Sequence, residues 1–187
     1  MDLVLFGIQG SGKGTQAKKL AEEFNYSIFE TGAELRKIAA SGTELGNIIK
    51  SYIDAGNLAP LDIVMEVVKQ AILAKPADQK LLFDGIPRDL EQMKSFNTIM
   101  REVGRDFRCV QLTLDDDTAF KRIQGRALQE GRADDANEEA IRRRMNIFKE
   151  RTLPVIESYR TDGNMTDIDG GRSIDEVYED LKSVVAA

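Results

Sequence analysis

Glycines and one lysine between residues 7 and 15 form the pattern of a phosphate-binding loop. The run reads Gly7-Ile-Gln-Gly-Ser-Gly-Lys-Gly-Thr15, which contains G-x-x-x-x-G-K followed by Gly-Thr in place of a direct Ser or Thr. Glycines let successive backbone N–H groups turn inward around a phosphate, and Lys13 adds a positive charge. The apolar run before the loop and the amphipathic pattern after it are the strand and the helix that such a loop needs. The sequence therefore predicts a site for nucleotide phosphates, in preference to an ordinary glycine-rich turn.

A carboxylate follows the apolar run Leu81–Phe83. If this run is a strand that neighbours the first one, Asp84 lies close to Lys13. A carboxylate there would bind the water shell of Mg²⁺, because this ion gives up its water reluctantly and bridges the phosphates of its ligands. Aspartate before glycine is also a common turn former, so a purely local role for Asp84 stays open at this stage.

Apolar runs alternate with helical patterns along the chain. Runs typical of buried strands lie at residues 2–7, 81–83, 109–114 and 165–168. Between and after them, apolar residues recur every three or four positions over 61–72, 141–159 and 174–181, as on one face of a helix. This alternation predicts an α/β fold. Its three layers form a sandwich in which right-handed crossovers join parallel strands, and ligands bind beyond the carboxyl ends of those strands.

Two segments fit this sandwich poorly. Residues 30–60 contain several glycines, among them Gly42 and Gly56, and predict short helices between glycine hinges. Residues 126–133 predict a compact turn among arginines. Both segments are candidates for movable flaps over the ligand.

The composition fits one soluble globular domain. The chain has 187 residues, of which 42% are hydrophobic and 31% are charged, and this excludes a disordered or fibrous protein. Cys109 is the single cysteine and there is no histidine, so an internal disulfide, the usual zinc sites and the commonest general base are all excluded. A net charge of −6 argues against nucleic-acid binding, and the apolar runs are far too short to cross a bilayer. We expect a cytoplasmic protein with no nucleic-acid or membrane partner.

Five motifs together resemble the adenylate kinase family of nucleoside monophosphate kinases. They occur in order across nearly the whole chain: Gly7 to Thr15, Thr31 to Arg36, Asp84 to Arg88, Gln92, and Gly131 to Asp135. The resemblance implies a single domain over residues 1–187, similar to P-loop nucleoside triphosphate hydrolases and built on a central parallel five-stranded sheet. It also implies a core (1–29, 61–121 and 136–187), a mobile NMP-binding flap (30–60) and a mobile lid of the short form (122–135).

The resemblance further implies a role for individual residues. The residues implied for ATP are Gly10, Ser11, Gly12, Lys13, Gly14, Thr15 and, stacked on its adenine, Arg122. Those implied for AMP are Thr31, Arg36, Gly85, Arg88 and Gln92. The implied catalytic residues are Lys13, Arg88, Arg126, Arg132 and Arg144, with Arg143 as the register alternative to Arg144. Each arginine alone would more often be a surface residue, but their convergence in an acidic protein points to a multiply charged anion.

The activity that the resemblance implies is reversible phosphoryl transfer from Mg-ATP to AMP, giving two ADP, by a monomer. Mg²⁺ would be held through water by Asp84. Four residues depart from the usual family pattern: Gln9 replaces the common Pro, Glu30 the common Ser, and Ala33 and Leu61 each a common Asp. None of these departures removes a phosphate-binding residue.

Three other functions share part of this residue pattern. A UMP/CMP kinase is the closest, but the resemblance implies that Thr31 and Gln92 favour AMP. A non-catalytic nucleotide-binding sensor has no need for the arginines implied in the lid. A GTPase-type switch is weakened because the chain has no Asn-Lys-x-Asp stretch to read guanine.

Overall fold

The computed structural model describes residues 1–130 and 137–186, and a parallel sheet lies at its centre. Within the described residues its strands are β1 (Asp2–Phe6), β2 (Ser27–Glu30), β3 (Leu81–Asp84), β4 (Phe107–Thr113) and β5 (Met165–Asp169). Their order is β2-β3-β1-β4-β5, and each neighbouring pair is parallel. This confirms the predicted five-stranded parallel sheet. The apolar runs gave no sign of β2, because this strand is short, lies at the edge of the sheet and has polar ends.

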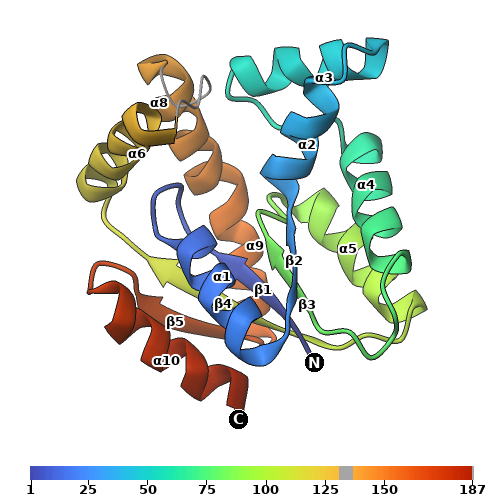
Figure 1. Ribbon diagram of the computed structural model, residues 1–187, viewed down its shortest axis with the longest axis vertical. Helices are drawn as coiled ribbons and strands as arrows, with labels where there is room; N and C mark the ends of the chain where they lie inside the picture. Colours follow the sequence, from blue (N-terminus) through green and yellow to red (C-terminus); the bar gives the residue numbers. More distant parts are fainter. Residues whose placement is uncertain (131–136, 187) are drawn as a thin grey trace.

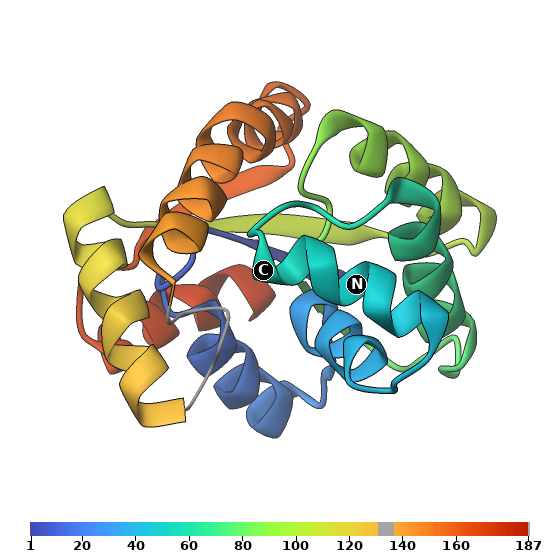
Figure 2. The same cartoon turned by 90° about the horizontal axis from the view of Figure 1, so that it is seen from above.

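Helices cover both faces of the sheet, as the three-layer prediction requires (Figure 1, Figure 2). Alternate residues of β1 point to opposite faces. Leu3 and Leu5 pack in a core with α1 (Lys13–Phe24) and α10 (Ile174–Ala186). Val4 and Phe6 belong to a larger core with α4 (Leu61–Leu73), α5 (Leu90–Glu102) and α9 (Leu153–Thr161).

Two pairs of helices stand beyond the carboxyl ends of the strands. Figure 1 shows α2 (Thr31–Ala39) and α3 (Glu44–Asp54) at the upper right, and α6 (Asp116–Glu130) and α8 (Glu138–Ile147) at the upper left. The predicted short helices of residues 30–60 are therefore present. Both pairs face the end of the sheet at which ligands of parallel α/β folds bind.

The expected turn at residues 126–133 is wrong in its first part. Residues 126–130 continue α6 as helix, and 131–136 lie outside the described residues. The apolar periodicity of residues 141–159 is confirmed, with one irregularity between α8 and α9. Residues Phe148–Thr152 form a π-helical turn, in which Leu153 N donates to Phe148 O, just before Pro154, which has no N–H to donate.

No helix within residues 1–130 and 137–186 has the length and apolar character needed to cross a membrane.

Candidate active site

The glycine-rich segment connects β1 to α1 and folds as an open loop. Gly10 has a φ of 83° and Gly12 a φ of 96°, in the left-handed region that favours glycine. A Cβ on Gly10 would also lie 2.9 Å from the carbonyl oxygen of Ala119 in α6. The buried Ser11 Oγ has no hydrogen-bond partner. The loop therefore has both the backbone shape and the unused polar atoms of an anion site.

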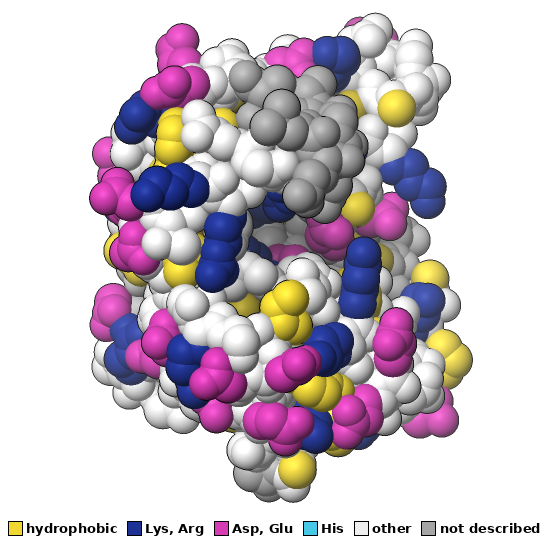
Figure 3. Space-filling model, turned by 60° about the vertical axis from the view of Figure 1, so that its left-hand side comes forward, with side chains coloured by type: hydrophobic (Ala, Val, Ile, Leu, Met, Phe, Trp, Pro, Cys, Tyr) yellow, Lys and Arg dark blue, Asp and Glu magenta, His cyan; other side chains and the backbone are white. Residues whose placement is uncertain are grey.

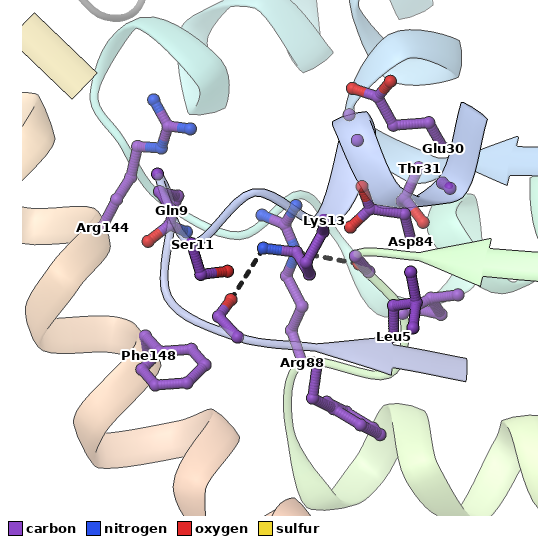
Figure 4. Close-up of a pocket in the computed structure, with 18 of the residues that line it drawn as sticks. Leu5, Gln9, Ser11, Lys13, Glu30, Thr31, Asp84, Arg88, Arg144 and Phe148 are labelled. Atoms are coloured by element: carbon purple, nitrogen blue, oxygen red, sulfur yellow. Dashed lines mark hydrogen bonds between the residues drawn. The ribbon is translucent and has the colours of Figure 1, made fainter. Parts of the chain in front are cut away.

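The side chain of Lys13 folds back onto its own loop and binds two of its carbonyl oxygens. Its Nζ donates to the carbonyl oxygens of Gly7 at 2.8 Å and Ile8 at 3.3 Å (Figure 4). Burial lowers the pKa of Lys13, the nearby arginines lower it further, and Asp84 opposes the shift. The positive charge of Lys13 is thus held at a cost in free energy that a bound anion would offset.

Asp84 lies beside the loop because β3 pairs with β1, which was the condition attached to this expectation in the sequence. Leu5 of β1 is its register partner on one side and Glu30 of β2 on the other. Asp84 is only 8% exposed, and Figure 4 shows its carboxylate facing the same space as Lys13. Burial raises the pKa of Asp84, Glu30 raises it further, and Lys13 opposes both. Asp84 is the last strand residue rather than part of the turn that follows it.

Cationic side chains from distant parts of the chain line one cavity of about 630 Å³. Besides Lys13, the predicted site residues among its lining include Arg36, Arg88, Arg122, Arg126 and Arg144. In the space-filling view the molecule is hollowed near the centre of this face, with Lys and Arg side chains at the rim (Figure 3). Such crowding of like charges favours binding of a multiply charged anion.

Arg88 is held by the segment between β3 and α5. Its Nε donates to Gly85 O at 2.8 Å, and its backbone N–H donates to Gln92 Oε1 at 2.8 Å. Gln92 N in turn donates to Oδ1 of Asp89, the N-cap of α5, at 2.8 Å. Burial lowers the pKa of Arg88 to about 10, Arg144 and Arg36 add to this, and Asp84 and Glu30 oppose it.

Arg36 and Thr31 enter the cavity from α2. A nitrogen of Arg36 (NH2) donates to Glu30 Oε1 at 2.9 Å. Thr31 is the first residue of α2, and its buried Oγ1 has no hydrogen-bond partner. The predicted acceptor residues thus lie on α2, on the segment after β3 and at the start of α5, and all of them line the cavity.

Arg122 ties α6 to the phosphate loop. Its NH1 donates to Gly170 O at 3.1 Å and to Gly10 O at 3.4 Å. Arg126 lies one helical turn further along α6. Of the two alternatives on α8, Arg144 lines the cavity, whereas Arg143 is exposed and pairs with Glu139. The predicted catalytic residue Arg132 lies outside the described residues.

Several residues that line the cavity were not predicted. Gln16 is 3% exposed, its Nε2 donates to Ile174 O at 2.9 Å, and its Oε1 is buried without a partner. Gly170 and Arg172 line the cavity from the turn after β5. One signal could have found Gln16, since it is a polar residue among the apolar positions of α1; the pair Gly170-Gly171 directly after a strand was another.

The parallel α/β sheet, the glycine-rich loop after its first strand and the cationic cavity at its carboxyl end define a P-loop nucleotide-binding protein. Comparison with known proteins narrows this class. The family model described as adenylate kinase matches residues 5–164.

Three similar proteins are named adenylate kinase. The one from Leptospira biflexa is 36% identical over 184 residues, which cover 97% of this chain and 98% of that protein. The one from Stenotrophomonas maltophilia is 35% identical over 188 residues and all of both chains. The one from Methanosarcina barkeri is 32% identical over 212 residues, covering 99% of this chain and 98% of that protein. The chain belongs to the adenylate kinase family.

Proposed function

We propose that the protein catalyses reversible phosphoryl transfer from ATP to AMP, giving two molecules of ADP. The observation that supports this most is the convergence of Lys13, Asp84 and the arginines on one cavity in a protein whose net charge is −6. Family membership agrees with it, since the similar proteins carry the name of this activity.

The donor triphosphate is assigned to the loop and α6. Backbone N–H groups of Gly10 to Thr15, with Lys13, would hold the β- and γ-phosphates. Arg122 would stack on the adenine from its place beside Gly10 and Gly170. The start of α1 at Lys13 adds the favourable end of a helix dipole.

The acceptor monophosphate is assigned to the opposite wall. Arg36 and Arg88 would bind its phosphate, while Thr31, Gly85 and Gln92 would contact the rest of AMP. The buried Thr31 Oγ1, which has no partner, supports a polar contact there.

The cavity offers a carboxylate ligand that suits a magnesium ion. Within the described residues no group of three or more His, Cys, Asp or Glu side chains could hold a metal ion. The buried carboxylate of Asp84 in the cavity lining suits Mg²⁺, which keeps several waters and binds through one or two carboxylates plus phosphate oxygens. When bound, the ion would neutralise charge on the phosphates.

The reaction needs positioning more than acid–base chemistry. An oxygen of the AMP phosphate forms a bond to the γ-phosphorus as the bond from that phosphorus to the β–γ bridging oxygen breaks, and ADP leaves. The acceptor needs no general base, because a phosphate monoester with a second pKa of about 6 is largely ionised at pH 7. Lys13, Arg88, Arg126, Arg132 and Arg144 would offset the repulsion between the two anions and the charge that spreads over the transferred group.

We assign residues 30–60 as the flap over AMP and 122–135 as the lid over ATP. Residues of α2 and α3 and residues of α6 and α8 line the cavity. Figure 1 shows these two pairs of helices on opposite sides of the molecule. Closure of both would exclude water that could otherwise take the γ-phosphoryl group.

A coupled assay tests the function. Protein mixed with ATP, Mg²⁺ and one of AMP, CMP, UMP or GMP should form ADP fastest with AMP. No ADP with AMP would contradict the proposal, and faster transfer to CMP or UMP would make the chain a pyrimidine nucleotide kinase. We also expect a monomer, because one chain supplies the whole cavity; light scattering on a sizing column should give a mass near 20.9 kDa.

A molecule that spans both subsites gives a second test without turnover. Two adenosines joined by five phosphates should bind one per chain in calorimetry and inhibit transfer, because each end fills one nucleotide subsite. The absence of binding would contradict the assignment of two subsites to one cavity.

A further inference from the structure

A second carboxylate stands in the acceptor half of the cavity. Glu30 ends β2 and is the register partner of Asp84 in β3. Its Oε1 accepts a hydrogen bond from the Arg36 guanidinium at 2.9 Å. Figure 4 shows Glu30 on the same side of the cavity as Thr31 and Asp84. The two partners of this ion pair are half-buried, with side-chain exposures of 30% for Arg36 and 37% for Glu30.

The negative charge of Glu30 acts on more than Arg36. Among the described residues that line the cavity, Glu30 and Asp84 are the acidic ones, facing several cations. Burial is the main cause that raises the pKa of Asp84, and Glu30 raises it further. Burial is also the main cause that lowers the pKa of Arg88, and Glu30 opposes that shift. Its field therefore reaches both arginines that we assign to the acceptor phosphate.

A phosphate that arrives at these arginines meets a charge of its own sign. A guanidinium has five N–H donors, so Arg36 has enough donors for Glu30 and a phosphate together. The two anions would then lie side by side on one cation, and like charges in a half-buried site repel. Without a ligand, the same carboxylate offsets the repulsion among the crowded cations.

We propose that Glu30 is an internal counter-ion of the acceptor site, which weakens the binding of the acceptor phosphate and so sets the affinity for AMP. The inference rests on the proposed function, because it assumes that AMP binds at Arg36 and Arg88. Glu30 is then a residue that determines affinity through its ion pair with Arg36, because its negative charge repels the phosphate of AMP.

The variant Glu30→Gln separates charge from hydrogen bonding. Glutamine keeps an oxygen that accepts from Arg36 but carries no charge. We expect KM for AMP, and the Kd of AMP measured by calorimetry, to fall about three- to tenfold, as for removal of a partly screened charge near an anion. KM for ATP should change by less than about twofold, because the P-loop binds the donor at the other side of the cavity. Glu30→Ser, which removes both charge and acceptor oxygen, should also lower KM for AMP.

Glu34 provides a matched control on the helix that follows Glu30. It lies one turn along α2, pairs with Lys37 and lines a second cavity. Glu34→Gln removes the same charge and should leave KM for AMP unchanged. A rise in KM for AMP in Glu30→Gln or Glu30→Ser would make Glu30 a positioning residue for Arg36 and overturn the proposal, as would an unchanged value in both.

The wild-type protein separates failure of this inference from failure of the proposed function. If wild-type protein forms no ADP from ATP and AMP, the proposed function is wrong. If it forms ADP and Glu30→Gln binds AMP no more tightly, then only the role of Glu30 is wrong.

Discussion

At the scale of single residues, the cavity holds charges that its surroundings disfavour. Burial lowers the pKa of Lys13 and raises that of Asp84, so each charged form costs free energy and the two partly offset each other. Lys13 Nζ also donates to two carbonyl oxygens of its own loop. An ammonium has three donors, so it can keep a bond to the loop while it binds a phosphate. A buried charged group such as Lys13 is stabilised most by a ligand of opposite charge.

Replacement of Lys13 tests this argument. Lys13→Met removes charge and donors while keeping much of the side-chain volume, and we expect the rate of ADP formation to fall more than about 100-fold, the scale for one lost oxyanion donor. Lys94→Met, at an exposed lysine of α5, is the control and should keep wild-type turnover. Near-normal turnover of Lys13→Met in a coupled assay would contradict the assigned role.

Arg88 differs from Lys13 because its proposed task is to capture and align AMP. Arg88→Ala should raise KM for AMP at least about tenfold and also lower kcat, because the acceptor phosphate loses a charge-assisted contact and its alignment. Steady-state kinetics with varied AMP measure this. Arg101→Ala removes an exposed arginine near the end of α5 and should change neither constant. An Arg88→Ala enzyme with unchanged AMP dependence would refute the assignment.

At the scale of elements, the turn between β3 and α5 determines where Arg88 points. Gly85 has a φ of 85°, its carbonyl oxygen accepts from Arg88 Nε at 2.8 Å, and the peptide between Ile86 and Pro87 is cis. Thr152 Oγ1 donates to Arg88 O at 2.8 Å, which ties this turn to the start of α9. The direction of the Arg88 guanidinium therefore depends on two hydrogen bonds, from its Nε to Gly85 O and from Thr152 Oγ1 to Arg88 O.

Alanine substitutions at two glycines, Gly85 in this turn and Gly104 after α5, distinguish backbone strain from steric crowding at Arg88. Gly85→Ala places a Cβ 2.9 Å from an Arg88 nitrogen, whereas Gly104→Ala, at a φ of 67°, meets nothing within 4 Å. Both changes should lower the free energy of unfolding by about 1–2 kcal/mol, because both put alanine in the left-handed region. Only Gly85→Ala should raise KM for AMP, by about tenfold or more, because small displacements of a positioning group are costly. Denaturant melts and AMP titrations of both variants measure the two effects, and equal KM values would contradict the argument.

At the scale of the whole molecule, different helices and the P-loop each contribute cationic residues to the cavity. Arg36 stands on α2, Arg122 and Arg126 on α6, and Arg144 on α8, while the P-loop stands on the sheet. We expect cations on both sides of one cavity to bring the sides together around a shared polyanion. The same contacts must separate before two ADP molecules leave.

We therefore predict that opening of the flaps limits turnover. In a rapid-quench experiment, the first turnover of phosphoryl transfer should be faster than the steady-state rate, because chemistry precedes the slow opening. A single-turnover rate equal to or below the steady-state rate would show that chemistry is limiting. The same preparation measured with and without excess substrate supplies the comparison.

Features that depend on local interactions could be predicted from the amino-acid sequence. Glycine spacing with Lys13 predicted the phosphate loop, because left-handed φ values depend on the residue itself. Buried strands of a parallel sheet read as continuous apolar runs, so β1, β3, β4 and the sandwich were predictable, and Asp84 followed from the end of one run. The prediction of β5 was also right, although this edge strand is mostly exposed. The family resemblance then supplied Arg88, Arg36 and Arg144 as candidates.

The contacts between residues far apart in the chain became known from the structure. It placed β2 at the edge of the sheet, put Glu30 beside Asp84, and chose Arg144 over Arg143 for the cavity. It also joined Arg122 to Gly10 and Gly170, which lie 112 and 48 residues away along the chain. Neighbours in sequence carry no information about such contacts, because they arise when separate elements pack on one sheet and bring their ends to a common edge.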